Sequence, residues 1–190
     1  ISNMRWNGEL YSMPMPTGGG ITGIVLVNVD MFEAAGQDVV VPETWQELQA
    51  LAEEFTVLDD RGIVTLGANV GTGGGDFFAW LYTNNGQIYS DDLRSVALNA
   101  PEGIENLERM VKFTNDGNGG VQNILDFFAT GQDANATQPW YNDVQLVNFP
   151  NVSIFFHMQT IKPEMKWDIG LRPYNGNNQN AKSQGISGEA

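Results

Sequence analysis

The residues of this sequence with the clearest chemical potential are aromatic side chains that stand beside a carboxylate. Phe77, Phe78, Trp80 and Tyr82 follow a glycine-rich loop, and Asp76 stands directly before them. Sugars present C–H faces that pack on flat rings, and their hydroxyls need polar partners. Helical spacing places Phe77 and Trp80 on one face, and one face of such a helix must enter the core. Asp76, Phe77 and Trp80 are therefore candidate ligand-binding residues.

A second candidate group is Trp140 with Tyr141, in segment 131–150, which lacks the apolar periodicity of a helix or a strand. In such a segment, burial in the core is a weaker explanation for aromatic residues. His157 is the single histidine. Two interpretations stay open for it: hydrogen bonding within a strand, or contact with a ligand at the end of that strand. Trp140, Tyr141 and His157 complete the candidate set.

The glycine-rich segment 71–75 invites comparison with a phosphate-binding loop. A P-loop needs a lysine followed by serine or threonine where the helix opens, but Asp76 and Phe77 occupy that junction. The charge of Asp76 would repel phosphate at this place. A flexible loop explains the glycines better.

Three kinds of catalytic site lack the residues that they need. A Ser-His-Asp triad would have to use His157, but the sequence has no Gly-x-Ser-x-Gly motif. A metal site at His157 would need carboxylate or cysteine partners nearby in the sequence. Paired acids could hydrolyse glycosides, but Asp59 with Asp60, and Asp91 with Asp92, fit exposed turns. The sequence therefore predicts a protein that is not an enzyme, with neither cofactor nor metal.

Length, charge and cysteine usage narrow the class of protein further. The chain of 190 residues is long enough for one domain with a sizeable core. Its formal net charge of −14 would repel nucleic-acid phosphates, so a nucleic-acid partner is not expected. The absence of cysteine excludes disulfides, thiolate catalysis and thiolate metal sites. A neutral or cationic ligand fits this composition better.

The apolar patterns predict strands that alternate with helices, which is typical of a mixed α/β domain. Strands are expected over 10–13, 21–29, 63–68, 152–158 and 167–171, and short helices over 31–35, 77–82 and 124–129. The segment after Pro173, rich in asparagine, glutamine and glycine, predicts a long exposed loop.

Two longer helices have clear start signals. Thr44 and Glu47 form a capping box, in which each side chain can satisfy a free backbone N–H at the other's position. A second helix is expected over 99–115, with proline near its first turn. Its inward stripe is expected to be Ile104, Leu107, Val111 and Thr114. The short helix 31–35 is expected to be capped by Asp30 and ended by Gly36.

Six segments, in their order along the chain, resemble the family 1 extracellular solute-binding proteins, which include maltose- and other oligosaccharide-binding proteins. Residues 42–48, Pro-Glu-Thr-Trp-Gln-Glu-Leu, are close to the family's PPTTWDEL block and are fairly specific. The others are residues 7–14, 25–36, 99–102, 128–132 and 167–173, similar in turn to DGKLYGLP, YYNKDLFEKAG, NSPEAVEAL, FxxGK and WDIGVAPLP.

The resemblance implies a fold of the α/β class, a periplasmic-binding-protein-like (type II) lobe with a mixed sheet flanked by helices. Residues 1–190 would form one lobe, mostly the second lobe of a two-lobed protein that closes on its ligand. Segments 1–20 and 174–190 would be inter-lobe or terminal segments. On this expectation the chain is part of a longer protein.

The resemblance also places the Trp80 region at the ligand cleft, with Phe77 and Trp80 as aromatic platforms. Residues 133–151 depart from the family's pattern, which puts the roles of Trp140 and His157 in doubt.

The expected function is that of a non-catalytic binding component, for a carbohydrate or another small solute, of an ABC-type importer. The partner of the full-length protein would be an ABC permease, and its location the periplasm or the cell exterior. An alternative is a structural or interaction module that uses the lobe without transport. An isolated lobe could form a homodimer to cover its exposed cleft face.

Overall fold

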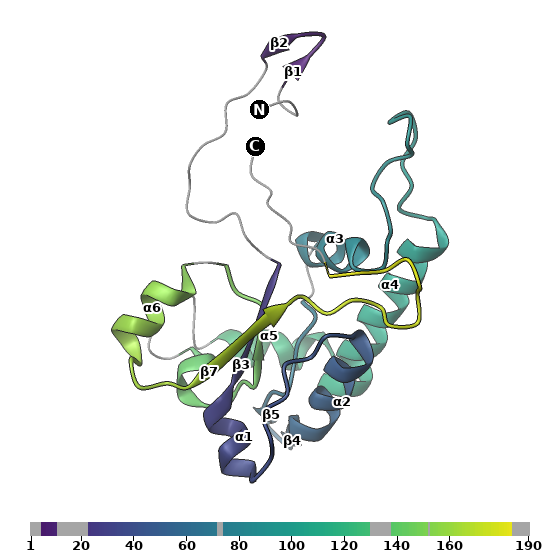
Figure 1. The fold of residues 1–190 in the computed structure, drawn as a ribbon. Helices are drawn as coiled ribbons and strands as arrows, with labels where there is room; N and C mark the ends of the chain where they lie inside the picture. Colours follow the sequence, from purple (N-terminus) through teal and green to yellow (C-terminus); the bar gives the residue numbers. More distant parts are fainter. Residues whose placement is uncertain (1–4, 11–22, 72–73, 130–137, 152, 184–190) are drawn as a thin grey trace.

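A computed structural model of the chain describes residues 5–10, 23–71, 74–129, 138–151 and 153–183. Strands and helices alternate along it (Figure 1). The strands are β1 (Arg5–Trp6), β2 (Glu9–Leu10), β3 (Ile24–Asn28), β4 (Val57–Asp59), β5 (Gly62–Thr65), β6 (Val147–Asn148) and β7 (Trp167–Leu171). The helices are α1 (Val29–Ala35), α2 (Trp45–Phe55), α3 (Gly74–Tyr82), α4 (Pro101–Lys112), α5 (Val121–Ala129) and α6 (Ile154–Ile161), with a π-helical turn at Phe113–Gly117 and a 3-10 turn at Pro139–Asn142.

The central element is β3, which lies between β6 and β7 and is antiparallel to both. Its sequence is almost continuously apolar because both of its faces are buried, and Val25, Leu26 and Val27 have no exposed surface. A parallel bridge between Leu66 and Gln145 extends the sheet beyond β6. The sheet thus contains both antiparallel strand pairs and a parallel bridge, so the expected mixed sheet is confirmed.

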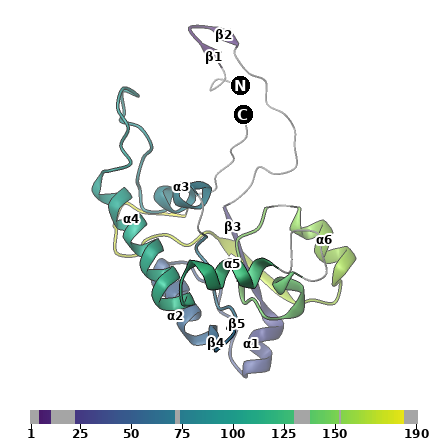
Figure 2. The same cartoon turned by 180° about the vertical axis from the view of Figure 1, so that it is seen from behind.

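The two faces of the sheet carry two hydrophobic clusters. Val25 and Val27 belong to the larger cluster, which includes buried side chains of α1, α2, α3 and α4. Leu26 belongs to the smaller cluster, with Trp140 and residues of α6. In Figures 1 and 2, α2 and α4 lie to one side of β3 and α6 lies to the other. The domain thus has the helix–sheet–helix layering that buries both faces of a sheet.

Two hairpins lie outside this sheet. β4 and β5 pair around a turn in which the Arg61 N–H donates to Asp59 Oδ1 at 2.8 Å, so the predicted turn at residues 59–62 is confirmed. β5 overlaps the predicted strand 63–68, whereas β4 was not predicted. β1 and β2 form a small ribbon apart from the rest of the domain (Figure 2). The predicted strand 10–13 lies mostly outside the described residues.

The helix ends follow local capping rules, with one correction. α1 is capped by Asn28, whose side chain accepts from the Met31 N–H at 3.2 Å, and not by Asp30. Asp30 lies in the first turn instead, where its charge favours the helix dipole. Gly36 ends α1 at φ 69°, as predicted. The capping box of Thr44 and Glu47 at the start of α2 is also confirmed.

α4 buries a different face from the predicted one. Ile104, Leu107 and Val111 are 50–53% exposed, and only Thr114 of the predicted stripe is buried. The buried positions of the helix are Gly103, Asn106 and Met110. Gly103 is needed there, because a Cβ at this position would overlap the Leu98 carbonyl oxygen. Close backbone contact and the buried Asn106 hydrogen bond to Phe77 O therefore set the rotation of α4.

Residues 154–161 form the helix α6, so the prediction of a strand over 152–158 is wrong. The β-branched and aromatic residues of this segment favour a strand by propensity. In the fold, however, Ile154 and Met158 lie four residues apart and are both buried in the smaller cluster. The Asn151 side chain accepts from the Ser153 N–H, which starts the turn. Tertiary contacts at helical spacing have overridden the propensity.

The observed bounds of β7, α3 and α5 agree with the predicted ranges to within one helical turn. β7 matches the predicted strand 167–171. α3 and α5 each begin three residues before the predicted helices 77–82 and 124–129. No helix of the described residues is long and apolar enough to cross a bilayer.

A buried amide cluster joins the segment after β7 to the turn that follows α3 and to α4. Asn175 Nδ2 donates to Asn84 Oδ1 at 2.8 Å and to Glu105 Oε1 at 3.1 Å. Asn84 Nδ2 donates to the other oxygen of the same carboxylate at 2.8 Å. Asn84 has no exposed surface and Asn175 is 2% exposed, so neither amide can exchange these partners for water.

We expect Asn175→Ala to lower the free energy of unfolding by about 1–3 kcal/mol, because it removes two side-chain hydrogen bonds, one of them to the buried Asn84. Urea denaturation of this variant measures the loss. Asn177→Ala is the control, since Asn177 is exposed in the same turn and only its backbone N–H contacts Asn175. Equal losses in the two variants would contradict the role of the cluster.

Candidate ligand-binding site

The main cavity of the described structure lies at one edge of the sheet. β6 and β7 both run antiparallel to β3, so they run parallel to each other and their carboxyl ends meet at the same edge. The strand segment through Leu66 bridges to β6 in parallel and ends there too. Ligands of open α/β sheets bind outside the carboxyl ends of strands. The cavity has a volume of about 500 Å³ and is lined by Asn69, Val70, Gly71, Asp76, Phe128, Gln138, Gln145, Val147, Asn148, Phe149 and Arg172.

Two side chains of opposite charge line this cavity. Asp76 lies in the first turn of α3, where the helix dipole favours its negative charge. Arg172 follows β7 directly and is 4% exposed. Its guanidinium carbon lies 4.8 Å from the ring of Trp80 and 4.8 Å from that of Phe149. Burial lowers the pKa of Arg172 to about 10, and the charge of Asp76 opposes this lowering. Arg172 stays cationic at neutral pH, so the cavity offers a fixed donor and a fixed acceptor.

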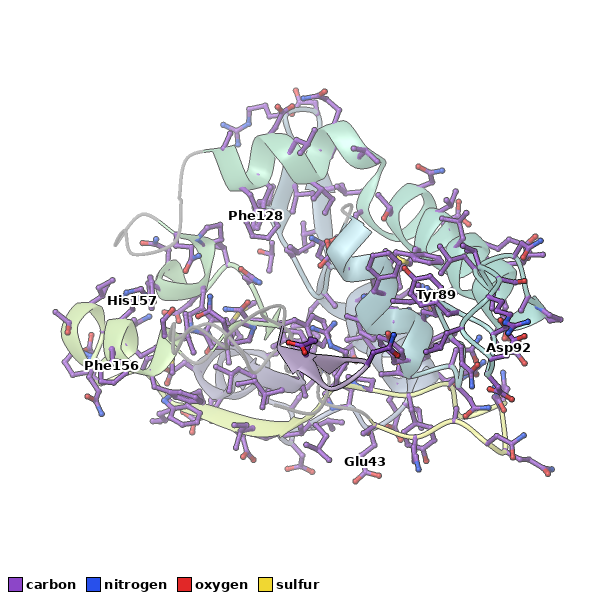
Figure 3. The ribbon with its side chains drawn as sticks, turned by 90° about the horizontal axis from the view of Figure 1, so that it is seen from above. Glu43, Tyr89, Asp92, Phe128, Phe156 and His157 are labelled. Atoms are coloured by element: carbon purple, nitrogen blue, oxygen red, sulfur yellow. The ribbon has the colours of Figure 1, made fainter. Side chains whose placement is uncertain are left out.

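Amide and aromatic side chains supply the rest of the wall. Gln145 Nε2 donates to the Val147 carbonyl at 3.0 Å, which fixes the orientation of that amide. Gln138 Oε1 is buried and has no hydrogen-bond partner among the described residues. The rings of Phe149 and Phe128 are half-buried. Figure 3 shows Phe128 below α5, on the side that faces the body of the domain. The wall therefore combines polar groups with flat rings.

A smaller hollow of about 270 Å³ adjoins the cavity. The two share Gln138, Asn148 and Phe149 as lining residues. The smaller one is completed on the α6 side by residues that include Ser153 and His157. Cavity and hollow are together called the recess, and their lining residues extend from Arg172 to α6.

The structure brings two of the six predicted site residues to this recess. Asp76 lines the cavity and His157 lines the smaller hollow. Phe77 is half-buried against the large cluster and is not a lining residue of the cavity. Tyr141 is 5% exposed and belongs to the smaller cluster.

Trp80 and Trp140 are core residues. Neither has any exposed surface, so neither ring offers a face to a ligand. Their N–H groups are satisfied internally, Trp80 Nε1 by the Val70 carbonyl at 2.7 Å and Trp140 Nε1 by Met158 Sδ at 3.4 Å. Trp80 was expected to be an aromatic platform for the ligand, but it lies in the core beneath the cavity. There it packs against Arg172 and, edge-to-face at 5.1 Å between ring centroids, against Phe149.

The polar and aromatic lining residues that the sequence analysis missed are Asn69, Phe128, Gln138, Gln145, Asn148, Phe149 and Arg172. Asn148 lies in β6, and Phe149 and Arg172 directly follow β6 and β7. The signal that could have found Arg172 and Phe149 is the position just beyond the carboxyl end of a predicted strand. For Phe149 this signal was weak, because β6 has only two residues and lies in a segment without periodicity.

Gly71 determines the position of the Asp76 carboxylate. A Cβ on Gly71 would overlap the carboxylate of Asp76, and the glycine has φ 79°. We expect Gly71→Ala to displace Asp76, weaken ligand binding and lower stability by about 1–2 kcal/mol through backbone strain.

The control for this variant is Gly36→Ala. Gly36 has φ 69° but open space around its missing Cβ, so it carries the strain without the overlap. Denaturation should report a loss for both variants that is at least as large for Gly71→Ala, because of the overlap, and calorimetry a loss of binding for Gly71→Ala alone. Unchanged binding in Gly71→Ala would contradict the role of Asp76.

Comparison with known proteins gives a consistent assignment. The sequence matches the family model described as bacterial extracellular solute-binding protein over residues 3–182. CpMnBP1 with mannobiose bound has a TM-score of 0.76 at 17% identity, over 97% of this chain and 45% of that one. Maltose-bound T. maritima MalE3 has a TM-score of 0.62 at 18% identity, over 98% of this chain and 46% of that one.

A third solved structure is the maltose/maltodextrin-binding domain MalE from Bdellovibrio bacteriovorus bound to maltotriose. Its TM-score is 0.66 at 16% identity, over 96% of this chain and 44% of that one. These similarities confirm the expected α/β lobe, and the chain spans less than half of the length of each of the three proteins. No curated protein sequence matches this chain.

Proposed function

Because this chain belongs to the bacterial extracellular solute-binding protein family, we propose that its cavity binds a carbohydrate or a polyol for an ABC-type importer. The observation that carries the proposal is the recess at the carboxyl ends of the strands. It combines Asp76 and Arg172 with amides and the rings of Phe128 and Phe149. Hydroxyls of a sugar both donate and accept hydrogen bonds, and its C–H faces pack on rings.

Ligands named in similar structures support a sugar or polyol. CpMnBP1 was solved with mannobiose and with mannotriose, MalE3 with maltose, and a solute-binding protein from Agrobacterium radiobacter with ribitol. The class of ligand is common to all of them.

The charges of the recess favour binding over hydrolysis. Among the described residues that line the cavity and the adjoining hollow, Asp76 is the only carboxylic acid. Glycoside hydrolysis usually uses two carboxyl groups about 5–10 Å apart. A single acid beside an arginine suits hydrogen bonding to hydroxyls, so we assign the chain a non-catalytic role.

The chain would supply one wall of the complete site. A further lobe would close over the recess, because burial of most of the ligand surface is what gives such sites their affinity. Residues 1–190 would form the lobe described here, with 1–20 and 174–190 leading towards the other lobe. The full-length protein would work in the periplasm or at the cell exterior and deliver its ligand to an ABC permease.

Isothermal calorimetry tests the proposal on the polypeptide of the complete reading frame. The panel is mannobiose, maltose, ribitol and, as a control, a neutral dipeptide. Heat with at least one sugar or polyol and none with the dipeptide is the expected result. Heat with the dipeptide alone would contradict the proposed ligand class.

A further inference from the structure

α4 carries a cation that is held without an ion pair. The Nη1 and Nη2 atoms of Arg109 are buried and have no hydrogen-bond partner among the described residues, and none of the ion pairs between these residues involves Arg109. Glu105 lies one turn earlier, but its carboxylate accepts from Asn84 and Asn175 instead. Burial of a cation without a counterion is costly, so the charge at this position lowers stability.

Aromatic rings are the neighbours of the Arg109 guanidinium. Its central carbon lies 4.1 Å from the ring centroid of Trp45, 4.7 Å from that of Trp80 and 5.6 Å from that of Phe113. The negative faces of such rings attract a cation and offset part of its desolvation. Trp45 belongs to α2 and Trp80 to α3, so the Arg109 side chain joins three helices.

Trp80 has a second cation as a neighbour, and this one lines the cavity. The guanidinium carbon of Arg172 lies 4.8 Å from the Trp80 ring and 4.8 Å from the Phe149 ring. Arg172 and Phe149 line the cavity, whereas Arg109 and Trp45 line a separate hollow of about 360 Å³. One series of contacts therefore leads from that hollow to the cavity, in the order Trp45, Arg109, Trp80, Arg172 and Phe149.

The two guanidiniums repel each other, because both are charged and both contact Trp80. Burial, and then the charge of Arg172, lower the pKa of Arg109 to about 9, so Arg109 stays cationic at neutral pH. Salt screens buried charges much less than exposed ones, so this repulsion persists at physiological ionic strength. It opposes movement of Arg172 towards Arg109, while the charge of Asp76 attracts Arg172 to the cavity.

We infer that Arg109 is a positioning residue of the recess, which holds the Arg172 guanidinium at the cavity wall by repulsion across Trp80. This inference rests on the proposed function, since Arg172 would donate hydrogen bonds to the ligand from that wall. Arg109 itself does not touch the ligand, because it lines the separate hollow and its Nη atoms are buried. The alternative is a structural role, in which Arg109 only packs on the rings.

A double-mutant cycle in urea denaturation tests the repulsion without any ligand. Arg109→Met and Arg172→Met remove the charges, and methionine still packs on aromatic rings. In the complete polypeptide, we expect the effect of Arg109→Met on the free energy of unfolding to be less favourable in the Arg172→Met background than in the wild type. The reason is that the repulsion it relieves is then already absent. Equal effects in the two backgrounds, or a more favourable effect in the Arg172→Met background, would overturn the inference.

The same cycle in calorimetry tests the consequence for the ligand. With the sugar or polyol of the panel that binds tightest, Arg109→Met should weaken binding about 3- to 10-fold in the wild-type background. It should change nothing in the Arg172→Met background, because Arg109 acts through Arg172. Lys112→Met is the matched control, since Lys112 is an exposed cation in the same last turn of α4, and it should bind like the wild type.

A structural role of Arg109 predicts a different result. Arg109→Met would then change binding equally with and without Arg172, or not at all, and either outcome would overturn the inference. Absence of binding by every sugar and polyol of the panel would contradict the proposed function instead. The denaturation cycle would still decide whether Arg109 acts on Arg172.

Discussion

Trp80→Ala is expected to lower the free energy of unfolding by about 3–5 kcal/mol. The ring has no exposed surface, packs edge-to-face with Trp45 and Phe149, and donates to the Val70 carbonyl. Its removal leaves a cavity in the large cluster and an unpaired buried acceptor. Urea denaturation monitored by circular dichroism measures the loss.

Two buried guanidiniums make this loss larger than that of an ordinary core residue. Arg109 and Arg172 lie 4.7 and 4.8 Å from the Trp80 ring. Burial lowers the pKa of Arg109 to about 9, with a further lowering by the charge of Arg172. Without the ring, each cation would lose one of the aromatic faces that partly compensate its desolvation, and would keep another, Arg109 that of Trp45 and Arg172 that of Phe149.

Trp80→Phe is the control for the packing argument. It keeps most of the ring but loses the N–H bond to Val70, so a loss of about 1–3 kcal/mol is expected. If Trp80→Ala were as stable as the wild-type protein, the assignment of Trp80 to the core would be wrong, and its earlier assignment to the ligand surface would return.

Asp76→Asn should weaken ligand binding about 10- to 150-fold, the equivalent of about 1.5–3 kcal/mol for a hydrogen bond to a charged group. Asp76 is the single carboxylate among the described lining residues of the recess, and it faces the same cavity as Arg172. The measurement is calorimetry of the complete polypeptide with the sugar or polyol of the panel that binds tightest.

The control for this variant is Asp91→Asn, which removes the same charge at an exposed turn outside the cavity. It should bind like the wild-type protein, which separates a direct contact from the effect of a net charge of −14. Stability of Asp76→Asn should also fall, by less than about 1 kcal/mol for the helix-dipole contribution of a first-turn acid and further through the lost charge that favours the cationic form of Arg172. Unchanged affinity would remove Asp76 from the site.

These two variants distinguish core residues that support the cavity from residues that line its surface. Trp80 belongs to the support, because it is buried and lies under Arg172 and Phe149. Asp76 belongs to the surface, because it lines the cavity. Both are held by α3, so the stability of that helix and the geometry of the site are linked.

Local signals were sufficient for most of the elements. The capping box of Thr44 and Glu47 fixes the start of α2, because its two hydrogen bonds involve only residues three positions apart. Gly36 ends α1 for an equally local reason, since its left-handed φ suits glycine. The apolar run of β3 predicts burial on both faces without reference to any partner.

Long-range packing decided the rest. The apolar stripe of α4 is predicted to be inward, yet the helix is rotated by the contact of Gly103 with Leu98 and by the Asn106 bond to Phe77. α6 has the composition of a strand but is helical, because Ile154 and Met158 fill one cluster at helical spacing. The spacing of apolar residues predicts which side chains share a face of a helix or strand. Only the elements that pack against it determine which face is buried.

The candidate site divides in the same way. The sequence by itself predicted a site of aromatic rings with polar groups; of its six candidates, Asp76 and His157 line the recess, whose rings are Phe128 and Phe149 instead of the predicted ones. Only the tertiary structure moved Trp80 and Trp140 into the core and brought Arg172, Phe149 and Gln145 to the cavity. The physical reason is that these residues meet through the pairing of strands that are distant in sequence. Spacing along the chain carries no information on that pairing.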